Sequence, residues 1–260
     1  MKGIIFAGDS FTWGQGLYYY SELPNLKIPK TGHYIDTYVT PAHRKFKDTK
    51  RFARLVANEF ETFELSKSGN GGSDYESIEF IDNIFKKDGY KYDDISYLIF
   101  QTTQFMRSPF ELEIDGEIKQ LHFNHSIMKM HNLHDFFIEW LNSNNYTLED
   151  YERFHINQIF NRIKNKFIEL EESGIKCKIL CWTADYLDLI KSDEYMNKRF
   201  IPILYDNNII NSFEEFMEIY PEMMIQNDSY FEKFNGDGHL SLNAHKIIAD
   251  TIIKKIKENE

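Results

Sequence analysis

Short apolar runs alternate with segments of helical hydrophobic spacing along most of the chain. Residues 3–7 form a continuous apolar run, which predicts a buried strand. Apolar side chains recur at helical spacing over 51–60 and again over 74–87, and strand patterns follow these segments at 63–66 and 95–100. The stretch between the first strand and the first of these helices is polar and rich in aromatic residues.

The alternation resumes in the second half of the chain. An amphipathic helix is predicted from 148 to about 173. A strand follows at 179–182, and 200–204 is interpreted as a short edge strand because its proline lacks the N–H that a central strand needs. Ser241 caps a last helix, whose apolar face includes Ile247, Ile248, Ile252 and Ile253. Strands that alternate with helices favour a mostly parallel sheet with helices on both faces.

The net charge and the lengths of the apolar stretches disfavour some classes of binding partner. The net charge is −11 at pH 7, which disfavours nucleic acids and anionic membrane surfaces, because both bind clusters of Lys and Arg. No apolar stretch reaches the roughly 18 residues of a membrane span, and the first apolar run is too short for a signal peptide. A neutral or cationic substrate, or one held by a few local basic groups, fits this charge better.

The two cysteines indicate the compartment. Cys177 and Cys181 are four residues apart in the segment 176–182; if that segment is a strand, they lie about 13 Å from each other, too far for a disulfide. Two buried thiols suit a reducing environment. The sequence therefore predicts a cytoplasmic protein.

Gly8-Asp9-Ser10 is the first candidate for chemistry. It follows the first predicted strand, at the carboxyl edge of the sheet, where open α/β sheets place their ligands. A serine there exposes its hydroxyl at the start of a helix, and its own N–H is available to stabilise an oxyanion. A Gly-x-Ser by itself is more typical of a helix N-cap, so this motif needs a partner elsewhere in the chain.

A carboxylate and a histidine near the C-terminus supply that partner. Asp237 precedes His239 by two residues in a glycine-rich loop just before the last helix. A carboxylate at that distance can orient the imidazole through one nitrogen and leave the other to deprotonate Ser10. A lone histidine in a loop is more often structural, but together with Gly8-Asp9-Ser10 it favours a catalytic triad.

These motifs resemble the conserved blocks of the SGNH/GDSL hydrolases. Three stretches carry the resemblance, in the family's order along the chain: Gly8-Asp9-Ser10 with Gly14 and Gly16, then Ser68-Gly69-Asn70-Gly71, then Asp237-Gly-His239 with His245. The Asp-x-His spacing is similar to a variant found among bacterial polysaccharide O-acetylesterases and O-acetyltransferases. The resemblance implies a flavodoxin-like three-layer α/β/α fold, no metal or other cofactor, and hydrolysis or transfer of an O-acyl group.

The third block of the family departs from its pattern here. It usually supplies an Asn whose amide completes the oxyanion hole, and Thr103 takes that position in this chain. The resemblance implies an oxyanion hole made of the Ser10 and Gly69 N–H groups, and we expect the amide of Gln101 or Gln104 to complete it. The candidate substrate contacts are Asp9, Asn70, Thr103 and Arg107; for Arg107, a solvated or salt-bridged side chain is the alternative.

The sequence thus predicts a serine esterase or O-acyltransferase that acts on a small O-acyl group, by analogy on a carbohydrate or related metabolite. The alternative is a binding module for a glycan or small molecule on a degenerate hydrolase fold, which the missing Asn favours. Zinc at His122-x-x-His125 and His131-x-x-His134 is disfavoured, because no carboxylate or thiol motif accompanies these pairs. A sugar-stacking platform is less expected than core packing for a set of aromatics, Tyr18 to Tyr20, Trp140, Tyr146, Tyr151 and Phe154.

Residues 105–148 interrupt the alternation of strands and helices. They are rich in aromatics, His and Asn, with a helix expected around 132–142. The segment is far longer than the two to six residues usual for such a connection, and it leaves the sheet at the edge that holds Ser10. We therefore expect one domain, 1–260, in which this insertion is a lid that sets substrate choice. The alternative is an insertion that packs on the far side or builds a dimer interface.

Overall fold

A four-stranded parallel sheet forms the centre of the computed structural model, which describes residues 2–21, 40–67, 72–108, 110–114, 117–121, 133–231 and 238–258. The strand order is β2-β1-β3-β6, with these bounds: β1 (Gly3–Ala7), β2 (Glu64–Ser66), β3 (Ile95–Gln101) and β6 (Lys176–Leu180). Counted within this sheet the order is 2-1-3-4, as in flavodoxin-like folds. The predicted parallel sheet is confirmed.

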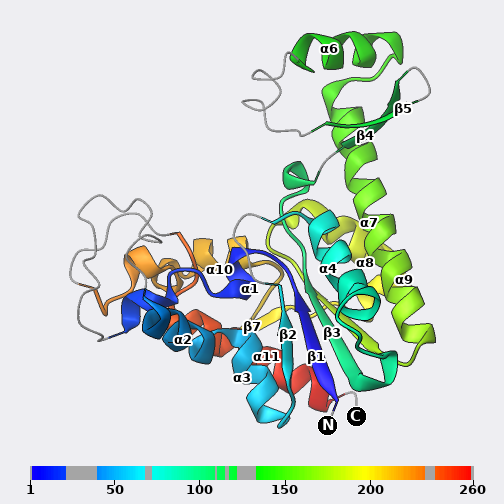
Figure 1. Cartoon of the computed structure of the whole chain (residues 1–260). Coiled ribbons are helices and arrows are strands. Elements are labelled where there is room, and N and C mark those ends of the chain that lie inside the picture. The colour runs from blue at the N-terminus through cyan, green and yellow to red at the C-terminus, as the bar shows by residue number, and fades with distance from the viewer. Residues whose placement is uncertain are drawn as a thin grey trace.

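Helices cover both faces of the sheet (Figure 1). One face carries α3 (Phe52–Glu59) and α11 (Leu242–Lys257), and the other carries α4 (Asp74–Lys86) and α7 (Leu148–Glu172). Alternate residues of β1 show why: Ile4 and Phe6 belong to the first core, whereas Ile5 and Ala7 belong to the second. A central strand with apolar side chains on both faces needs a helical layer on each side, which gives the three-layer α/β/α fold.

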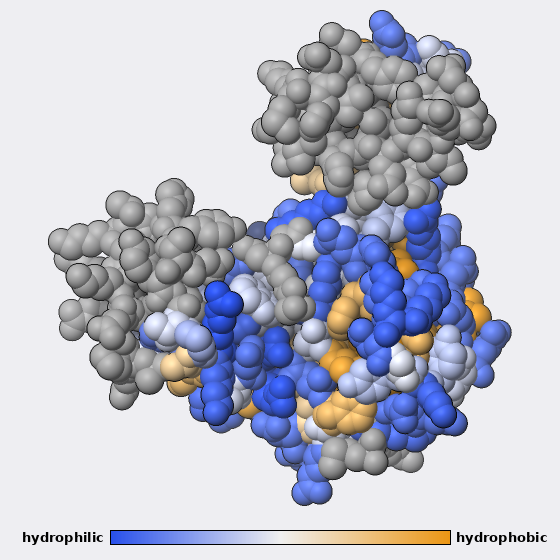
Figure 2. Space-filling view, in the orientation of Figure 1, coloured by the Kyte–Doolittle hydropathy of each residue, from blue (hydrophilic) through white to orange (hydrophobic). Residues whose placement is uncertain are grey.

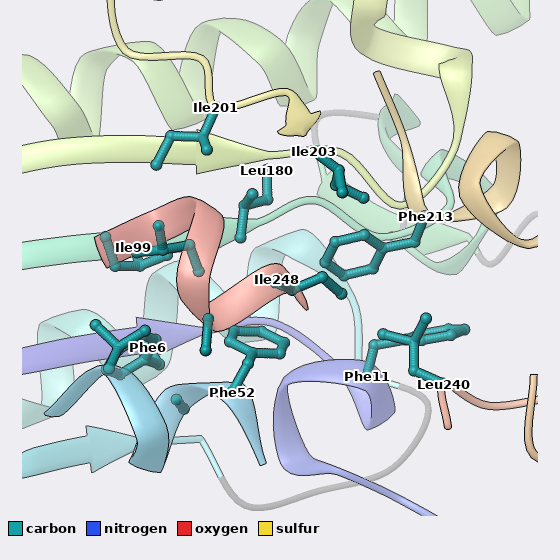
Figure 3. Packing of buried hydrophobic residues seen from close by; sticks show 14 of the residues in the cluster. Phe6, Phe11, Phe52, Ile99, Leu180, Ile201, Ile203, Phe213, Leu240 and Ile248 are labelled. Atoms are coloured by element: carbon teal, nitrogen blue, oxygen red, sulfur yellow. The ribbon is translucent and has the colours of Figure 1, made fainter. Parts of the chain in front are cut away.

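The first core is dense and rich in phenylalanine (Figure 3). Phe6 packs edge-on against Phe52 at a ring-centroid distance of 6.3 Å, and Phe52 contacts Phe213 at 6.2 Å. Phe11 joins the same cluster from the short helix α1 (Ser10–Trp13), with its ring 5.9 Å from that of Phe213. The helix that carries Ser10 is therefore held in place by the hydrophobic core itself.

The helix boundaries follow recognisable signals. The side chain of Ser241 accepts the Ala244 N–H at the start of α11, as predicted. Thr147 caps α7 in the same way, and that helix ends before Gly174, whose φ of +87° suits glycine. The remaining helices are α2 (Pro41–Lys50), α6 (Leu133–Ser143), α8 (Leu187–Ser192), α9 (Glu194–Asn197) and α10 (Phe213–Ile219), with 3₁₀ turns η1 (Leu17–Tyr20), η2 (Tyr92–Asp94), η3 (Phe105–Arg107), η4 (Ala184–Tyr186), η5 (Pro221–Met223) and η6 (Ile225–Asn227).

Three sequence predictions were wrong in detail. The strand expected at 179–182 is β6, which begins at Lys176 and ends at Leu180, because its lysines disguise the first half of an apolar strand. The segment 200–204 is not a strand of the sheet: Phe200 forms an isolated bridge to Ile179. A separate antiparallel hairpin follows, made of β7 (Ile203–Tyr205) and β8 (Asn208–Ile210). Helix α2 was not predicted, because only His43 and Lys47 of its ten residues are buried and it has no apolar stripe.

The insertion contains a hairpin as well as the expected helix. The antiparallel strands β4 (Phe110–Ile114) and β5 (Glu117–Leu121) precede α6, which starts close to the predicted position. Figure 1 shows these elements at the N-terminal end of α7, beyond the end of the sheet that is opposite to the two chain termini. The Trp140 ring of α6 packs edge-on against Tyr151 of α7, with a centroid distance of 6.0 Å. The hairpin and α6 thus form a lobe carried by the first turns of α7.

The surface is mostly hydrophilic over the α/β body on the face in Figure 2, with smaller hydrophobic patches among the charged residues. Within the described ranges, no helix combines the length and the apolarity that crossing a bilayer requires.

Candidate active site

Ser10 stands at the carboxyl edge of the sheet, three residues after β1 ends at Ala7. Asp9 is the N-cap of α1, because its Oδ1 accepts the Phe11 N–H at 3.1 Å. Ser10 is therefore not the cap, and the alternative assignment for this serine is wrong. No acceptor for the Ser10 N–H occurs among the residues that the structure describes.

His239 lies directly beside Ser10 although the two are far apart in sequence. The distance from His239 Nε2 to Ser10 Oγ is 2.9 Å. The loop that carries the histidine is pinned on both sides: the His239 carbonyl accepts the Ile225 N–H at 2.9 Å, and the Ser241 N–H donates to the Met223 carbonyl at 2.7 Å. At this distance an imidazole nitrogen is able to accept the proton of a serine hydroxyl.

Phe11 supports the imidazole from one side. Its ring centroid is 5.2 Å from that of His239 and 4.9 Å from that of Trp182, which follows β6. The predicted orienter Asp237 lies outside the described residues, as do Gly69 and Asn70 of the second block. Their predicted roles stay predictions.

Asp9 and Arg107 form an ion pair next to Ser10. Arg107 Nη1 lies 2.8 Å from Asp9 Oδ2, and the guanidinium stacks on Trp182 with its Cζ 4.3 Å from the ring centroid. The Asp9 side chain is fully buried; burial raises the pKa of this carboxyl, while the Phe11 N–H and the Arg107 charge oppose the increase. Both Asp9 oxygens are thus engaged within the protein, whereas the Arg107 side chain keeps 29% of its surface exposed.

Gln101 is committed to structural bonds at the end of β3. Its Oε1 accepts the Thr12 hydroxyl at 2.8 Å, and its Nε2 donates to the Thr102 carbonyl at 2.8 Å. Gln104 is partly buried and its side chain makes no hydrogen bond to another described residue. Of the two candidate amides, Gln104 is the one left available for an oxyanion.

The backbone of Thr103 is bound by the Asp74 carboxyl group. Its N–H donates to Asp74 Oδ1 at 2.8 Å, and Thr103 is completely buried. Asp74 is also fully buried and accepts the Tyr186 hydroxyl on Oδ2 at 2.9 Å. Burial raises the pKa of Asp74 to about 7, and the negative charge of Asp9 adds to the increase. Sequence reasoning missed Asp74, because an acidic residue in the first turn of a helix is ordinary.

The other clusters are accounted for where the structure describes them. Among the described residues no group of three or more His, Cys, Asp or Glu is placed to hold a metal ion, and the paired histidines from 122 to 134 lie outside those residues or have undescribed side chains. Tyr18, Tyr19, Tyr20 and Tyr151 are buried core residues, while Tyr146 and Phe154 are about two-fifths exposed. Both cysteines are buried and unbridged.

Comparison with known proteins finds no matching family model and no matching curated protein. Among solved structures, the chain resembles an acetyl xylan esterase from Butyrivibrio proteoclasticus (13% identity, TM-score 0.47, 99% of this chain and 64% of that one). It also resembles a protein from Desulfitobacterium hafniense ascribed to the lipolytic G-D-S-L family (9%, 0.45, 98% and 99%). A third is a family two carbohydrate esterase from Clostridium thermocellum in complex with cellohexaose (13%, 0.45, 99% and 64%).

The chain therefore spans 64% of the length of two of these three proteins. At 9 to 13% identity, the role of each site residue has to be argued from this chain alone.

Proposed function

We propose that this chain is a serine esterase that hydrolyses a small O-acyl ester, with Ser10 as nucleophile and His239 as general base. One observation supports this above all: the 2.9 Å separation of His239 Nε2 and Ser10 Oγ at the carboxyl edge of the sheet. A histidine and a serine that served only the fold would have no need to meet at this edge across more than two hundred residues of chain.

In the proposed mechanism, His239 Nε2 removes the hydroxyl proton as Ser10 Oγ attacks the ester carbonyl. Asp237 orients the imidazole and stabilises its protonated form. The protonated imidazole then gives the proton to the departing alcohol oxygen, which leaves an acyl ester on Ser10. A water, activated by the same imidazole, releases the acid. An acceptor hydroxyl in place of water makes the reaction an O-acyl transfer.

The oxyanion is proposed to bind the N–H groups of Ser10 and Gly69 and the side-chain amide of Gln104. The available Ser10 N–H supports the first donor, and the unengaged Gln104 amide supports the third. We propose that Arg107, fixed by Asp9 and Trp182, presents its exposed N–H groups to a polar group of the substrate, a carbohydrate or related metabolite. Asp9 would then act through Arg107 and α1 rather than touch the substrate.

A serine-reactive fluorophosphonate tests the proposal. The wild-type chain is expected to be labelled at Ser10, while Ser10→Ala and His239→Ala lose the label and hydrolyse p-nitrophenyl acetate at least 100-fold more slowly. Ser192→Ala is the matched control, because Ser192 is an exposed helix residue that bonds only to its own turn. Labelling at a different serine, or no labelling of the wild type, would reject the assignment.

The competing function is a binding module for a glycan on the same fold, and the absence of the third-block Asn favours it. A module of this kind would bind acetylated oligosaccharides without turning them over. Isothermal titration with a panel of acetylated sugars, run beside the hydrolysis assay, separates the two functions.

A further inference from the structure

Asp74 differs from an ordinary acidic residue at a helix start. It is the first residue of α4, but the capping there is done by Ser73 and Glu76, each of which bonds the other's backbone N–H. Both Asp74 oxygens bond outside the helix instead, to the Thr103 N–H and the Tyr186 hydroxyl. Among the described residues no cation pairs with this buried carboxyl. A buried carboxyl without a counter-charge is costly, so its position calls for a reason other than helix stability.

The three segments that meet at Asp74 are those that follow β2, β3 and β6 at the Ser10 edge of the sheet. Helix α4 begins a few residues after β2, Thr103 lies two residues after β3, and Tyr186 lies on η4 beyond β6. Thr102 is fastened separately to β6, because its N–H donates to the Leu180 carbonyl at 2.9 Å. Asp74 is thus the contact that ties the segment after β3 to α4.

The strand register shows why the position of Thr103 matters to Ser10. Strands β1 and β3 are paired with Ala7 opposite Phe100. Ser10 and Thr103 each follow these partners by three residues, so the two segments leave the sheet side by side. They are also joined by the bond from the Thr12 hydroxyl to Gln101. A shift of the segment that carries Thr103 would move the neighbouring Gln104 relative to Ser10.

We propose that Asp74 is a positioning residue: it fixes the segment after β3 beside Ser10 and thereby sets the distance between the nucleophile and the oxyanion donors. This inference rests on the proposed esterase function and adds to it a residue that makes no contact with the reacting atoms. In this chain, where Thr103 stands in place of the usual Asn, the backbone is anchored by a carboxyl on the adjacent helix.

The experiment compares Asp74→Ala and Asp74→Asn with Ile81→Val, a buried control on the same helix. The alanine variant removes the acceptor for the Thr103 N–H, so kcat for p-nitrophenyl acetate should fall about 10- to 100-fold with little change in KM. The asparagine variant keeps an amide oxygen for that N–H and should recover most of the loss. Ile81→Val should lower the melting temperature and leave kcat unchanged. If the alanine variant does not fold, Asp74→Ser, whose hydroxyl is too short to reach Thr103, takes its place.

Hydrogen exchange of the peptide that contains Thr103 gives a readout independent of activity. Exchange should become faster in Asp74→Ala and stay unchanged in Ile81→Val. Unchanged exchange in the alanine variant overturns the anchor, and faster exchange with unchanged kcat and fluorophosphonate labelling rate overturns its role in catalysis. A wild type that is not labelled at all rejects the esterase and with it the catalytic role of Asp74, and the exchange measurement still decides whether Asp74 holds the segment.

Discussion

Gly8 shows how closely the chain segments approach each other next to Ser10. A Cβ atom at this position would lie 2.4 Å from Thr12 Oγ1 and 2.8 Å from Gln101 Oε1, the two atoms of the hydrogen bond that joins α1 to β3. A glycine is therefore required between the first strand and Ser10 by packing, and not by an unusual backbone angle.

Gly8→Ala is expected to destabilise the fold by about 1–3 kcal/mol, since the added methyl overpacks a buried site. It should also slow fluorophosphonate labelling of Ser10, because the Thr12–Gln101 bond must open. Gly89→Ala is the matched control: Gly89 has a φ of +79° and open space around it, so alanine there costs about 1 kcal/mol in backbone strain without touching the site. Equal labelling rates in the two variants would contradict the packing argument.

Single residues could be predicted from the sequence where they belong to a short local motif. Ser10 and His239 could be named as candidates because each lies in a recognisable local motif, and the structure places them within 2.9 Å of each other. Asp74 could not, because its partners Thr103 and Tyr186 are set by which strands are neighbours in the sheet. The bonds of Gln101 to Thr12 and Thr102 were not predictable for a related reason: they depend on the exact register of β1 and β3.

Helices α3 and α11 are joined by an unusual cap. The N-cap residue of α3, Arg51, provides no side-chain hydrogen bond, and the Phe52 N–H donates instead to His245 Nδ1 of α11 at 3.2 Å. The His245 ring also stacks on Phe52, with centroids 5.6 Å apart. Burial, aided by the charge on His239, lowers the pKa of His245 to about 3, so the imidazole is neutral in the folded protein.

This arrangement predicts that the fold loses stability in acid through His245. The pKa of the unfolded histidine is about 6.5, so between pH 6.5 and 3 the unfolded chain binds a proton that the folded chain does not. The contribution of His245 is therefore complete above about pH 6.5 and declines as the pH falls towards 3. His245→Gln keeps an acceptor for the Phe52 N–H but does not titrate.

Urea denaturation of the wild type and of His245→Gln at pH 7.5 and pH 5 measures the difference. The wild type should lose more free energy of unfolding than the variant over this interval. An identical loss in both proteins would show that His245 does not sense pH.

At the scale of elements, the sequence predicted what local patterns encode. The apolar runs of β1 and β3 and the cap at Ser241 were sufficient to locate those elements. Helix α2 was not predicted although Thr40 caps it and Pro41 stands at its first position, because its mostly exposed residues show no apolar stripe at helical spacing. The pairing of β7 with β8 depends on tertiary contacts with α10 and α11, which periodicity does not report.

The whole molecule divides into a body, which has one large hydrophobic core on each face of the sheet, and a lobe that projects from it. The two cores lie on opposite faces of the sheet and contain buried residues from β1, β3 and β6 and from the helices that flank the sheet. Of the lobe of β4, β5 and α6, no residue with a described side chain belongs to either core. One described contact between the lobe and the rest is the packing of Trp140 on Tyr151, near the start of α7. One turn further along α7, the segment that leads from β3 into the lobe contacts this helix, since His155 Nε2 lies 3.1 Å from the Ser108 carbonyl oxygen. The body is therefore expected to fold without the lobe.

This division makes the lid hypothesis testable by removing the lobe. The Ser108 carbonyl contacts His155 of α7. Thr147, the N-cap of α7, lies eight residues before His155, about 12 Å along the helix. A linker of about six Gly and Ser residues spans that distance and can replace residues 110–146. The trimmed chain should keep the cooperative unfolding of the body and the labelling of Ser10, because the described residues around Ser10 and His239 come from the body.

If the lobe forms a wall of the substrate site, trimming should change the rates of hydrolysis of bulky acetylated sugars by tenfold or more. The rate on p-nitrophenyl acetate should stay within about twofold, because only the larger substrates extend beyond the Ser10 edge. Trp140→Ala in the full-length chain is the companion variant, because it removes the Tyr151 contact and keeps the lobe's length. An unchanged ester profile in the trimmed chain would rule out the lid, and a change in sedimentation coefficient from dimer to monomer would instead identify the lobe as an interface.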